Sequence, residues 1–328
     1  MTGEREAGAK AVVVAGAGVT GLTTAITLLE SGYRVTVLSA QMPEQTTSAA
    51  AGATWFPYKV SPRQRVSRWA AASRRAFDDL SRDSRSGVTI RQCVQLWRDT
   101  VERNPWWAAA VPDLGRLPAR QLPPGFADSY VFTQPVIDMR RYLPYLLRRF
   151  MSVGGKTRVT TLGSLEEASR LGDIVVNCTG LGARTLAGDG DLYPVRGHLA
   201  RVRNPGIRQV IADFDNPAGE AYVIPHDDSC LLGGTADEHE WDTTADPAVS
   251  VQIRARCVEL DRRLAGAEFL GHAIGLRPAR ISGVRLDVAR LENGTPCVHN
   301  YGHGGAGVTL SWGCAAEVLD LVHGTLYS

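Results

Sequence analysis

Apolar residues near the N-terminus follow the order expected of a strand, a helix and a second strand. Residues 11–15 form a short, continuous apolar run, which is typical of a parallel strand buried on both faces. Apolar side chains then recur at helical spacing from Leu22 to Leu29, and Gly32 follows as a helix-ending residue. Residues 33–39 have the composition of a second strand. The pattern predicts a β–α–β unit at the start of an α/β fold.

The next part of the chain has a different pattern, in which helices are separated by irregular segments. Residues 66–80 carry one apolar face at helical spacing, and so do residues 139–150. Pro144 predicts either a late start or a kink in the second of these helices. Residues 99–136 are rich in Pro and Trp, so we expect an irregular covering segment there. A short helix is predicted over residues 164–171.

A further buried strand, residues 173–178, is followed by a run of strands without intervening helices. Consecutive strands of this kind predict a mainly antiparallel sheet, distinct from the first fold. One helical face over residues 249–264 is expected to pack on that sheet. The predicted strands of the run cover residues 198–203, 207–212, 221–225 and 230–233.

The C-terminal part of the chain predicts a hairpin, a glycine-rich loop and a last helix. Residues 284–291 and 296–301 read as the two strands of the hairpin. The loop covers residues 299–313, and the apolar run at 315–322 indicates a helix. A helix that begins in such a loop aims free N–H groups and a positive dipole end at whatever binds there. We therefore expect the loop and the helix to embrace an electron-rich cofactor.

Together these patterns predict an α/β protein with a second domain of α+β type. A nucleotide-binding domain of Rossmann type is expected to be assembled from discontinuous segments, residues 1–57, 151–195 and 284–328. Residues 58–150 and 196–283 are expected to form a substrate-binding domain on a mixed or antiparallel sheet.

Composition excludes several classes of partner. The chain of 328 residues is 44% hydrophobic and 21% charged, as in ordinary globular proteins, and is long enough for two sub-domains. A net charge of +2 gives no reason to expect nucleic acid or an anionic membrane as partner. No signal-peptide pattern or bilayer-spanning apolar run is present, so a cytoplasmic location is expected. The 6 cysteines lack metal-like spacing, so we expect free, mostly buried thiols and no metal site.

The turn after the first strand carries candidate cofactor chemistry. Residues 16–21 match G-x-G-x-x-G between a strand and a helix, the context in which this motif binds a dinucleotide. Its glycines permit the tight turn, the approach of backbone to pyrophosphate and close helix–strand packing. The acid expected after the second strand is absent, because Ser39, Ala40 and Gln41 stand there. The predicted cofactor residues of this turn are Gly16, Ala17, Gly18, Val19, Thr20 and Gly21.

Two further groups of small residues are expected to face the same cofactor. Residues 46–53 directly follow the β–α–β unit and carry hydroxyl groups, which favours a phosphate-facing loop over a bare linker. Residues 179–182 follow a buried strand at its carboxyl end, where open α/β sheets bind ligands. The candidates in and beside these segments are Thr46, Thr47, Ser48, Ala51, Gly52, Ala53, Cys178, Thr179 and Gly180.

Motifs spread over nearly the whole chain resemble those of the D-amino-acid oxidase family. GAGVTG, NCTG, PVRGH, AYVIP, GLRPAR and HNYGHGGAGVTLSWGCA occur in that family's order and approximate spacing, and the last is the most specific. The resemblance implies non-covalent FAD in a domain of separated segments, and a substrate domain on a mixed sheet. It also implies oxidation of D-amino acids to imino acids with oxygen as acceptor. Hydrolysis and flavin reoxidation would then give 2-oxo acids, ammonia and hydrogen peroxide.

The same resemblance implies roles for particular residues. Arg277 is the implied partner of the substrate carboxylate, which a planar guanidinium grips with two parallel hydrogen bonds. Tyr222 would hydrogen-bond the same carboxylate, and the carbonyl of Gly305 would accept from the substrate amine. Hydride transfer from Cα to flavin N5 would then depend on orientation rather than on acid–base residues. A structural salt bridge for Arg277 and a core position for Tyr222 are the alternatives. The residues implied at the flavin are Arg277, Leu162, Gly304, Gly307, Val308 and Thr309.

Other positions bear on catalysis and specificity. His299 and His303 are interpreted as scaffold residues of the glycine loop, because no nucleophile or acid accompanies them. Phe56, Ala218 and Ala306 depart from better-known members of the family, where larger or more polar residues are common. A pocket without those groups should be wider or more apolar, so we expect neutral, fairly bulky D-amino acids as substrates.

Several other functions stay open at this point. A D-aspartate oxidase would need an additional cation, for which Arg208 is a candidate, whereas Asp213, Asp215 and Glu220 precede Tyr222. A glycine- or sarcosine-type flavin amine oxidase, a nicotinamide-linked dehydrogenase and a non-enzymatic nucleotide-binding protein are further alternatives. The expected partners are a D-amino acid and oxygen, and a homodimer is possible.

Overall fold

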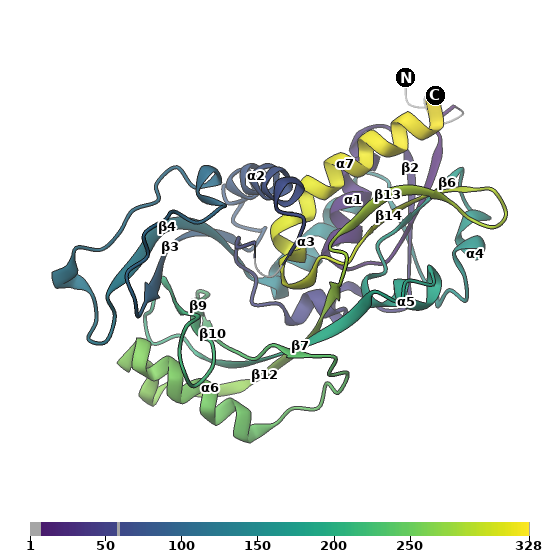
Figure 1. Cartoon of the computed structure of the whole chain (residues 1–328). Coiled ribbons are helices and arrows are strands. Elements are labelled where there is room, and N and C mark those ends of the chain that lie inside the picture. Colours follow the sequence, from purple (N-terminus) through teal and green to yellow (C-terminus); the bar gives the residue numbers. More distant parts are fainter. Residues whose placement is uncertain (1–7, 58–59, 328) are drawn as a thin grey trace.

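Two β-sheets with helices packed against them form the body of the protein (Figure 1). The computed structural model describes residues 8–57 and 60–327. The N-terminal part, residues 156–177 and the C-terminal part of the chain meet in the first sheet, and the two segments between them form the second. This confirms the predicted α/β class with a second, mainly antiparallel sheet.

The first sheet has the strand order β13-β14-β6-β1-β2-β5. β1 lies in its centre and pairs in parallel with β2 and with β6, while only β13 runs antiparallel to its neighbour β14. A central parallel strand is covered on both faces, which explains why the run that forms β1 is continuously apolar. The strands are β1 (Ala11–Ala15), β2 (Arg34–Ser39), β5 (Lys156–Val159), β6 (Ile174–Asn177), β13 (Arg285–Arg290) and β14 (Pro296–Tyr301).

Four helices lie together beside the first sheet (Figure 1). α1 (Val19–Glu30) packs against α7 (Gly307–Tyr327), α2 (Arg63–Leu80) packs against α7, and α3 (Met139–Ser152) packs against α1. α2 and α3 belong to the segment that interrupts the nucleotide-binding unit, yet they pack on its helices. The domain boundaries given above stay a prediction. Two short helices, α4 (Leu165–Ser169) and α5 (Ala183–Leu186), flank β6 in the sequence.

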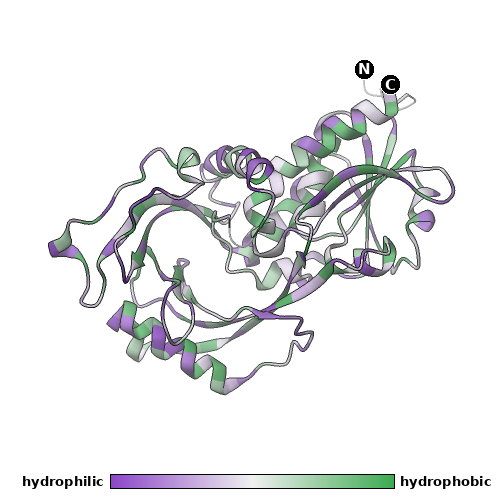
Figure 2. Ribbon diagram, viewed as in Figure 1, coloured by the Kyte–Doolittle hydropathy of each residue, from purple (hydrophilic) through white to green (hydrophobic). Residues whose placement is uncertain are grey.

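The second sheet has 8 strands in the order β11-β7-β10-β9-β8-β3-β4, with β12 paired to β7. Its pairs are antiparallel except for β3 with β8, as the run of strands without helices predicted. α6 (Pro247–Leu260) packs on β7, β9 and β10, and Figure 2 shows both hydrophobic and hydrophilic positions along it. The strands are β3 (Val88–Trp97), β4 (Asp128–Ile137), β7 (Leu192–Arg203), β8 (Val210–Asp213), β9 (Ala221–Pro225), β10 (Ser229–Gly233), β11 (Asp237–Glu238) and β12 (Phe269–Arg280).

Five strands differ from expectation. The prediction of an irregular segment over 99–136 is wrong from residue 128 onward, because β4 forms there and pairs with β3. β3, β5, β11 and β12 were not predicted. β4 and β12 contain Pro135 and Pro278, and each is the outer strand of its pair, where a missing backbone N–H leaves no ladder bond unmade.

The last helix is longer than its apolar pattern indicates. α7 begins at Gly307, so residues 307–313 of the predicted loop are helical, and a short 3-10 helix over Gly304–Ala306 directly precedes them. Gly313 lies inside the helix because a Cβ there would overlap the backbone of Trp69 on α2. A glycine that lowers helix propensity thus permits close packing of the two helices. Similarly, Pro144 lies within α3, which begins at Met139, so the late start is wrong.

Candidate active site

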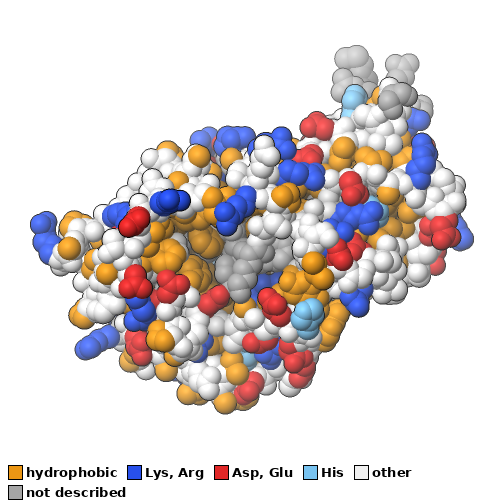
Figure 3. Space-filling model, viewed as in Figure 1, with side chains coloured by type: hydrophobic (Ala, Val, Ile, Leu, Met, Phe, Trp, Pro, Cys, Tyr) orange, Lys and Arg blue, Asp and Glu red, His pale blue; other side chains and the backbone are white. Residues whose placement is uncertain are grey.

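A cavity of about 950 Å³ lies between the two sheets. The first sheet contributes the residues that follow β1, β2 and β6, together with the first turns of α1 and α7. The second sheet contributes residues of β3, β4, β7, β8, β9 and β12. Figure 3 shows a hollow near the centre of one face, with hydrophobic side chains inside it and charges of both signs interspersed around it.

The residues predicted from sequence come together around this cavity. All of the predicted site residues except Gly21 line it. They come from segments far apart in the chain: residues 16–20, 46–53, 162, 178–180, 222, 277 and 304–309.

The glycine turn is built so that side chains would not fit. Gly16 has a φ of 110°, a left-handed conformation that favours glycine, and a Cβ there would overlap the carbonyl oxygen of Cys178. A Cβ at Gly21 would overlap the carbonyl oxygen of Gly16, which explains why Gly21 is needed although it does not line the cavity. Gly18 lies next to the hydroxyl of Ser48, so a Cβ at Gly18 would be only 3.0 Å from Ser48 Oγ. The turn therefore brings bare backbone to the cavity at the start of α1.

Two hydroxyl groups of the 46–53 loop form hydrogen bonds within the protein. Ser48 Oγ accepts a hydrogen bond of 3.0 Å from the backbone N–H of Val19, in the first turn of α1. Thr47 Oγ1 donates to the carbonyl oxygen of Leu276 at 2.9 Å, which ties the loop to β12. The Ser48 hydroxyl proton stays available for a ligand, whereas the Thr47 proton is already used.

The first turn of α7 forms another wall of the cavity. Gly307, Val308 and Thr309 line it, so the positive end of a 21-residue helix faces the space. Thr309 Oγ1 accepts from the backbone N–H of Phe56 at 3.1 Å and is 2.9 Å from its carbonyl oxygen. Thr309 thus joins α7 to the chain that follows the 46–53 loop.

The two histidines of the glycine-rich segment are buried and bound by amide side chains. His303 Nε2 is 3.1 Å from Asn300 Oδ1, and burial lowers the pKa of His303 to about 4. His299 Nδ1 is 3.3 Å from Asn177 Nδ2, and burial, followed by the charge of Arg285, lowers the pKa of His299 to about 4. Both rings are neutral near pH 7, as suits scaffold residues that cross-link the strand ends.

Arg277 and Tyr222, the two side chains implied for the substrate carboxylate, lie side by side in the cavity wall. Burial raises the pKa of the Tyr222 phenol to about 12, against the opposing charge of Arg277, so the phenol keeps its proton at neutral pH. Arg277 Nη1 donates to the carbonyl oxygen of Thr235 at 3.1 Å. Within residues 8–57 and 60–327, no ion pair joins Arg277 to a carboxylate. Its remaining N–H groups can therefore receive an anion.

Glycines also make room for these two side chains. A Cβ at Gly197, on β7, would lie 2.5–2.6 Å from the Nη1, Cζ and Nη2 atoms of Arg277. The ring of Tyr222 occupies the place that a Cβ of Gly233 would take. The guanidinium and the phenol are thus seated against bare backbone, which fixes their positions.

Two of the three positions linked to specificity are not in the cavity wall. Phe56 lines the cavity and stacks on Phe214, with ring centroids 5.5 Å apart. Ala306 is fully buried in the core instead, and Ala218 also lies outside the wall. Arg208 is exposed and does not line the cavity. Ala218 and Ala306 therefore do not line the pocket themselves, and the expectation that their small size widens it stays a prediction.

Sequence reasoning missed the residues that β3, β4 and β8 add to the wall. Gln95 and Gln134 line the cavity, and so do Cys93 and Val210. The signal was weak, because it consists only of the alternation in residues 88–97, in which Cys93 and Gln95 face one side.

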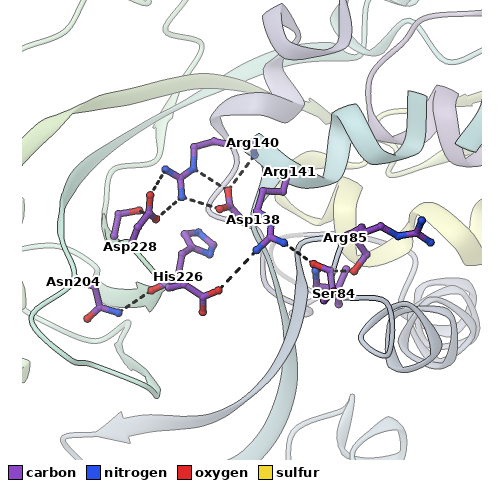
Figure 4. Close-up of polar contacts among 12 residues, drawn as sticks. Ser84, Arg85, Asp138, Arg140, Arg141, Asn204, His226 and Asp228 are labelled. Carbon is purple, nitrogen blue, oxygen red and sulfur yellow. Dashed lines mark hydrogen bonds and ion pairs between the residues drawn. The ribbon is translucent and has the colours of Figure 1, made fainter. Parts of the chain in front are cut away.

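A second, smaller cavity of about 390 Å³ lies beside the start of α3, and its charges are already paired. Arg140 bonds both Asp138 and Asp228, from the start of α3 and from the turn between β9 and β10 (Figure 4). Hydrogen bonds from Arg140 hold the pKa of Asp228 well below its usual range. Asp227 pairs with Arg91 at 3.0 Å. We interpret this cluster as a clamp between α3 and the second sheet.

Other classes of site find no support in the described part of the chain. Residues 8–57 and 60–327 hold no group of three or more His, Cys, Asp or Glu arranged for a metal ion. None of the helices there combines the length and apolar character that crossing a bilayer requires. The 6 cysteines are free and buried, as predicted.

Comparison with known proteins gives one consistent assignment. The family model described as FAD dependent oxidoreductase (DAO) matches residues 11–321. The D-amino-acid oxidase of Rubrobacter xylanophilus is 48% identical over 97% of this chain and 97% of its own length. The D-aspartate oxidase of Homo sapiens is 34% identical, over 95% and 94% of the two chains.

Solved structures show the same fold at lower identity. Glycine oxidase from Geobacillus kaustophilus superposes with a TM-score of 0.80 at 18% identity, over 96% of this chain and 95% of that one. This likeness concerns the fold alone, whereas the sequence matches above define the family. The chain belongs to the D-amino-acid oxidase family of FAD-dependent oxidoreductases.

Proposed function

We propose that this protein is a D-amino-acid oxidase that converts neutral, fairly bulky D-amino acids to 2-oxo acids, ammonia and hydrogen peroxide. One observation carries the proposal: Arg277 and Tyr222 line the same cavity as the glycine turn and the start of α7. The two side chains proposed to bind the substrate carboxylate, Arg277 and Tyr222, thus face the cavity in which the family's cofactor would bind. The relatives named D-amino-acid oxidase support the same chemistry.

The cavity fits FAD by the shape and polarity of its walls. Gly16 and Gly21 leave no room for side chains at the turn, so backbone can approach a pyrophosphate directly. The starts of α1 and α7 direct N–H groups and positive dipole ends to the cavity, where they favour phosphate and a reduced, anionic ring. When bound, FAD supplies the two-electron acceptor for the hydride at the substrate Cα. We propose that it is bound without a covalent link.

The chain's own residues would orient the substrate rather than exchange protons with it. Arg277 would bind the carboxylate through two parallel N–H groups, and the Tyr222 phenol, protonated at neutral pH, would donate to the same group. The carbonyl of Gly305, at the cavity wall, would accept from the substrate amine. Clamping these two groups fixes which of the remaining substituents faces the flavin, and this fixes the D configuration. The neutral, scaffold-bound His299 and His303 have no part in this scheme.

A preference for acidic substrates is not favoured by the wall. Arg277 is the one Lys or Arg side chain among the described residues of the wall, and the proposal already uses it for the α-carboxylate. Glu220 lines the same cavity and adds no positive charge that could pair with a second carboxylate on the substrate. Phe56 and Phe214 instead offer an apolar surface. A neutral side chain therefore suits the site better.

Flavin absorption and oxidase activity test this proposal. Purified protein should be yellow, and denaturation should release the flavin into the supernatant if it is held without a covalent bond. A peroxide assay with paired D- and L-amino acids should respond only to the D-enantiomers. If D-methionine, D-alanine and D-proline all fail to bleach the flavin anaerobically, the oxidase assignment is wrong. Activity with D-aspartate above that with D-methionine would contradict the preference for neutral substrates.

The homodimer and the cytoplasmic location are also proposals that rest on the sequence. Light scattering on the purified holoenzyme would test the first, since the dimer predicts twice the mass of one 35.4 kDa chain. Cell fractionation followed by the peroxide assay would test the second.

A further inference from the structure

One row of residues on the cavity face of the second sheet has a polar side chain at each end. Tyr222 on β9 pairs with Ala212 on β8, and Ala212 pairs with Gln95 on β3. Residues that are paired in register point to the same face of a sheet, and all three line the cavity. Two strand spacings place the Cα atoms of Tyr222 and Gln95 about 10 Å apart.

The adjacent row on the same face is apolar throughout. Ile224 and Val210 lie two residues further along β9 and β8, and Val210 pairs with Cys93. All three line the cavity, and Cys93 and Val210 are almost fully buried. Gln95 is thus a carboxamide set at one end of an otherwise apolar patch of wall.

The side-chain oxygen of Gln95 is left without a hydrogen-bond donor. The side chain is 4% exposed, and its Oε1 atom is buried without a partner among the residues that the structure describes. Buried polar atoms are almost always hydrogen-bonded, so the missing partner is expected from the contents of the cavity. The terminal amide can be turned by half a rotation, so Gln95 can offer either its oxygen or its NH₂ group.

The row also provides a path between the two polar ends. The Tyr222 ring lies over Gly233, which is on β10 and therefore on the side of Tyr222 away from Gln95. Ala212, between them, projects only a methyl group into the cavity. A substrate whose carboxylate is held at Tyr222 and Arg277 can therefore extend its side chain over Ala212 toward Gln95.

We propose that Gln95 is a specificity-determining residue that binds the neutral, polar end of a long substrate side chain, such as the carboxamide of D-glutamine. This proposal rests on the oxidase function argued above and names a substrate class for it. A neutral amide gives Gln95 Oε1 the partner that it lacks, whereas a charged end group would have to lose its hydration against the apolar row. A short side chain, such as that of D-alanine, ends before it reaches Gln95.

The test is a comparison of two substrates of similar length. In the holoenzyme we would measure kcat/KM for D-glutamine and for D-methionine, and then repeat both measurements in Gln95→Met, which keeps the volume and removes the amide. We expect the ratio of D-glutamine to D-methionine to fall about tenfold, the effect of one good hydrogen bond. A ratio that stays within about twofold of the wild-type value would show that Gln95 does not bind the substrate, and the proposal would be wrong.

Gln134→Met is the matched control. Gln134 is also buried in the cavity wall with an unpartnered Oε1, but it lies on β4, opposite Arg91 and four residues along the ladder from the row of Gln95. Its substitution should leave the ratio unchanged. If Gln134→Met lowers the ratio as much as Gln95→Met does, the assignment to Gln95 is refuted.

Two further measurements keep the outcomes apart. Oxidation of D-alanine and D-methionine by the wild-type protein tests the oxidase function separately; if wild type oxidises no D-amino acid, the oxidase function itself fails. Should Gln95→Met not bind flavin, Gln95→Glu gives a second test, because a carboxylate there should raise the ratio of D-lysine to D-norleucine. No change in that ratio would again refute the proposal.

Discussion

The substitution Gly197→Ala would test how the position of the Arg277 guanidinium is fixed, without changing Arg277 itself. The new Cβ would lie 2.5–2.6 Å from three guanidinium atoms, whereas ordinary contacts of this kind are about 3.5 Å. The atoms that must give way are the far end of a flexible side chain, so β7 can stay in place while the guanidinium moves by about 1 Å. A misplacement of about 1 Å in a group that orients substrate can cost about a hundredfold in rate, or about 2.7 kcal/mol.

The expected result is a loss of about a hundredfold in kcat/KM for D-methionine, with flavin content and unfolding free energy near wild type. Gly190→Ala is the matched control, since a Cβ there meets nothing within 4 Å. In the background of Arg277→Ala, Gly197→Ala should cost almost nothing more, because both changes act through the same contact. Full additivity of the two losses, or a loss of flavin in Gly197→Ala alone, would refute the reasoning.

Three further predictions concern the cofactor turn, the last helix and pH. Gly21→Ala should abolish flavin binding, measured as flavin absorbance per mole of folded protein, because its Cβ would overlap a backbone carbonyl of the turn; a fully yellow variant would contradict this. Gly313→Ala should destabilise the protein by about 2 kcal/mol in urea unfolding, because its Cβ meets the Trp69 backbone. Gly324→Ala, on the same helix in open space, should be neutral or stabilise by up to about 1 kcal/mol. Burial lowers the pKa of His303 from 6.5 to about 4. As the pH falls, the unfolded chain therefore binds this proton before the folded protein does. The folded state should lose about 3 kcal/mol of stability between about pH 6.5 and about pH 4. His303→Gln should remove that part of the slope of unfolding free energy against pH, and an unchanged slope would show that His303 does not cause it.

The parts of the fold that the sequence predicted are those in which local pattern and tertiary role agree. β1 and the helix after it follow from a continuous apolar run and a glycine turn, because a central parallel strand must be apolar on both faces. β12 gave no such signal. It contains Gly271, Gly275 and Pro278, which weaken a strand, and it forms because 11 of its residues pair with β7. Pairing partners that are distant in sequence cannot be seen in a single local pattern.

α7 shows the same conflict in a helix. Its first two turns contain Gly307 and Gly313, so local propensity indicates a loop up to residue 313. Packing outweighs this propensity, because only a residue without a Cβ lets α7 approach the backbone of Trp69 on α2. The loss in propensity is thus offset by contacts between two helices that the sequence does not show to be neighbours.

The predicted site residues came together around the cavity, but two of the three positions linked to specificity, Ala218 and Ala306, do not line it, for a geometric reason. Successive side chains in a tight helical turn point in different directions, so Gly305 and Gly307 face the cavity while Ala306 between them is buried in the core. Nearness to a motif in sequence therefore does not place a side chain in the pocket. The part of the wall beside Tyr222 comes from β8 and β3, which lie outside every motif, and Gln95 there is a polar residue in an apolar setting. Relatives that share Arg277 and Tyr222 can thus differ in substrate through strands that their motifs do not cover.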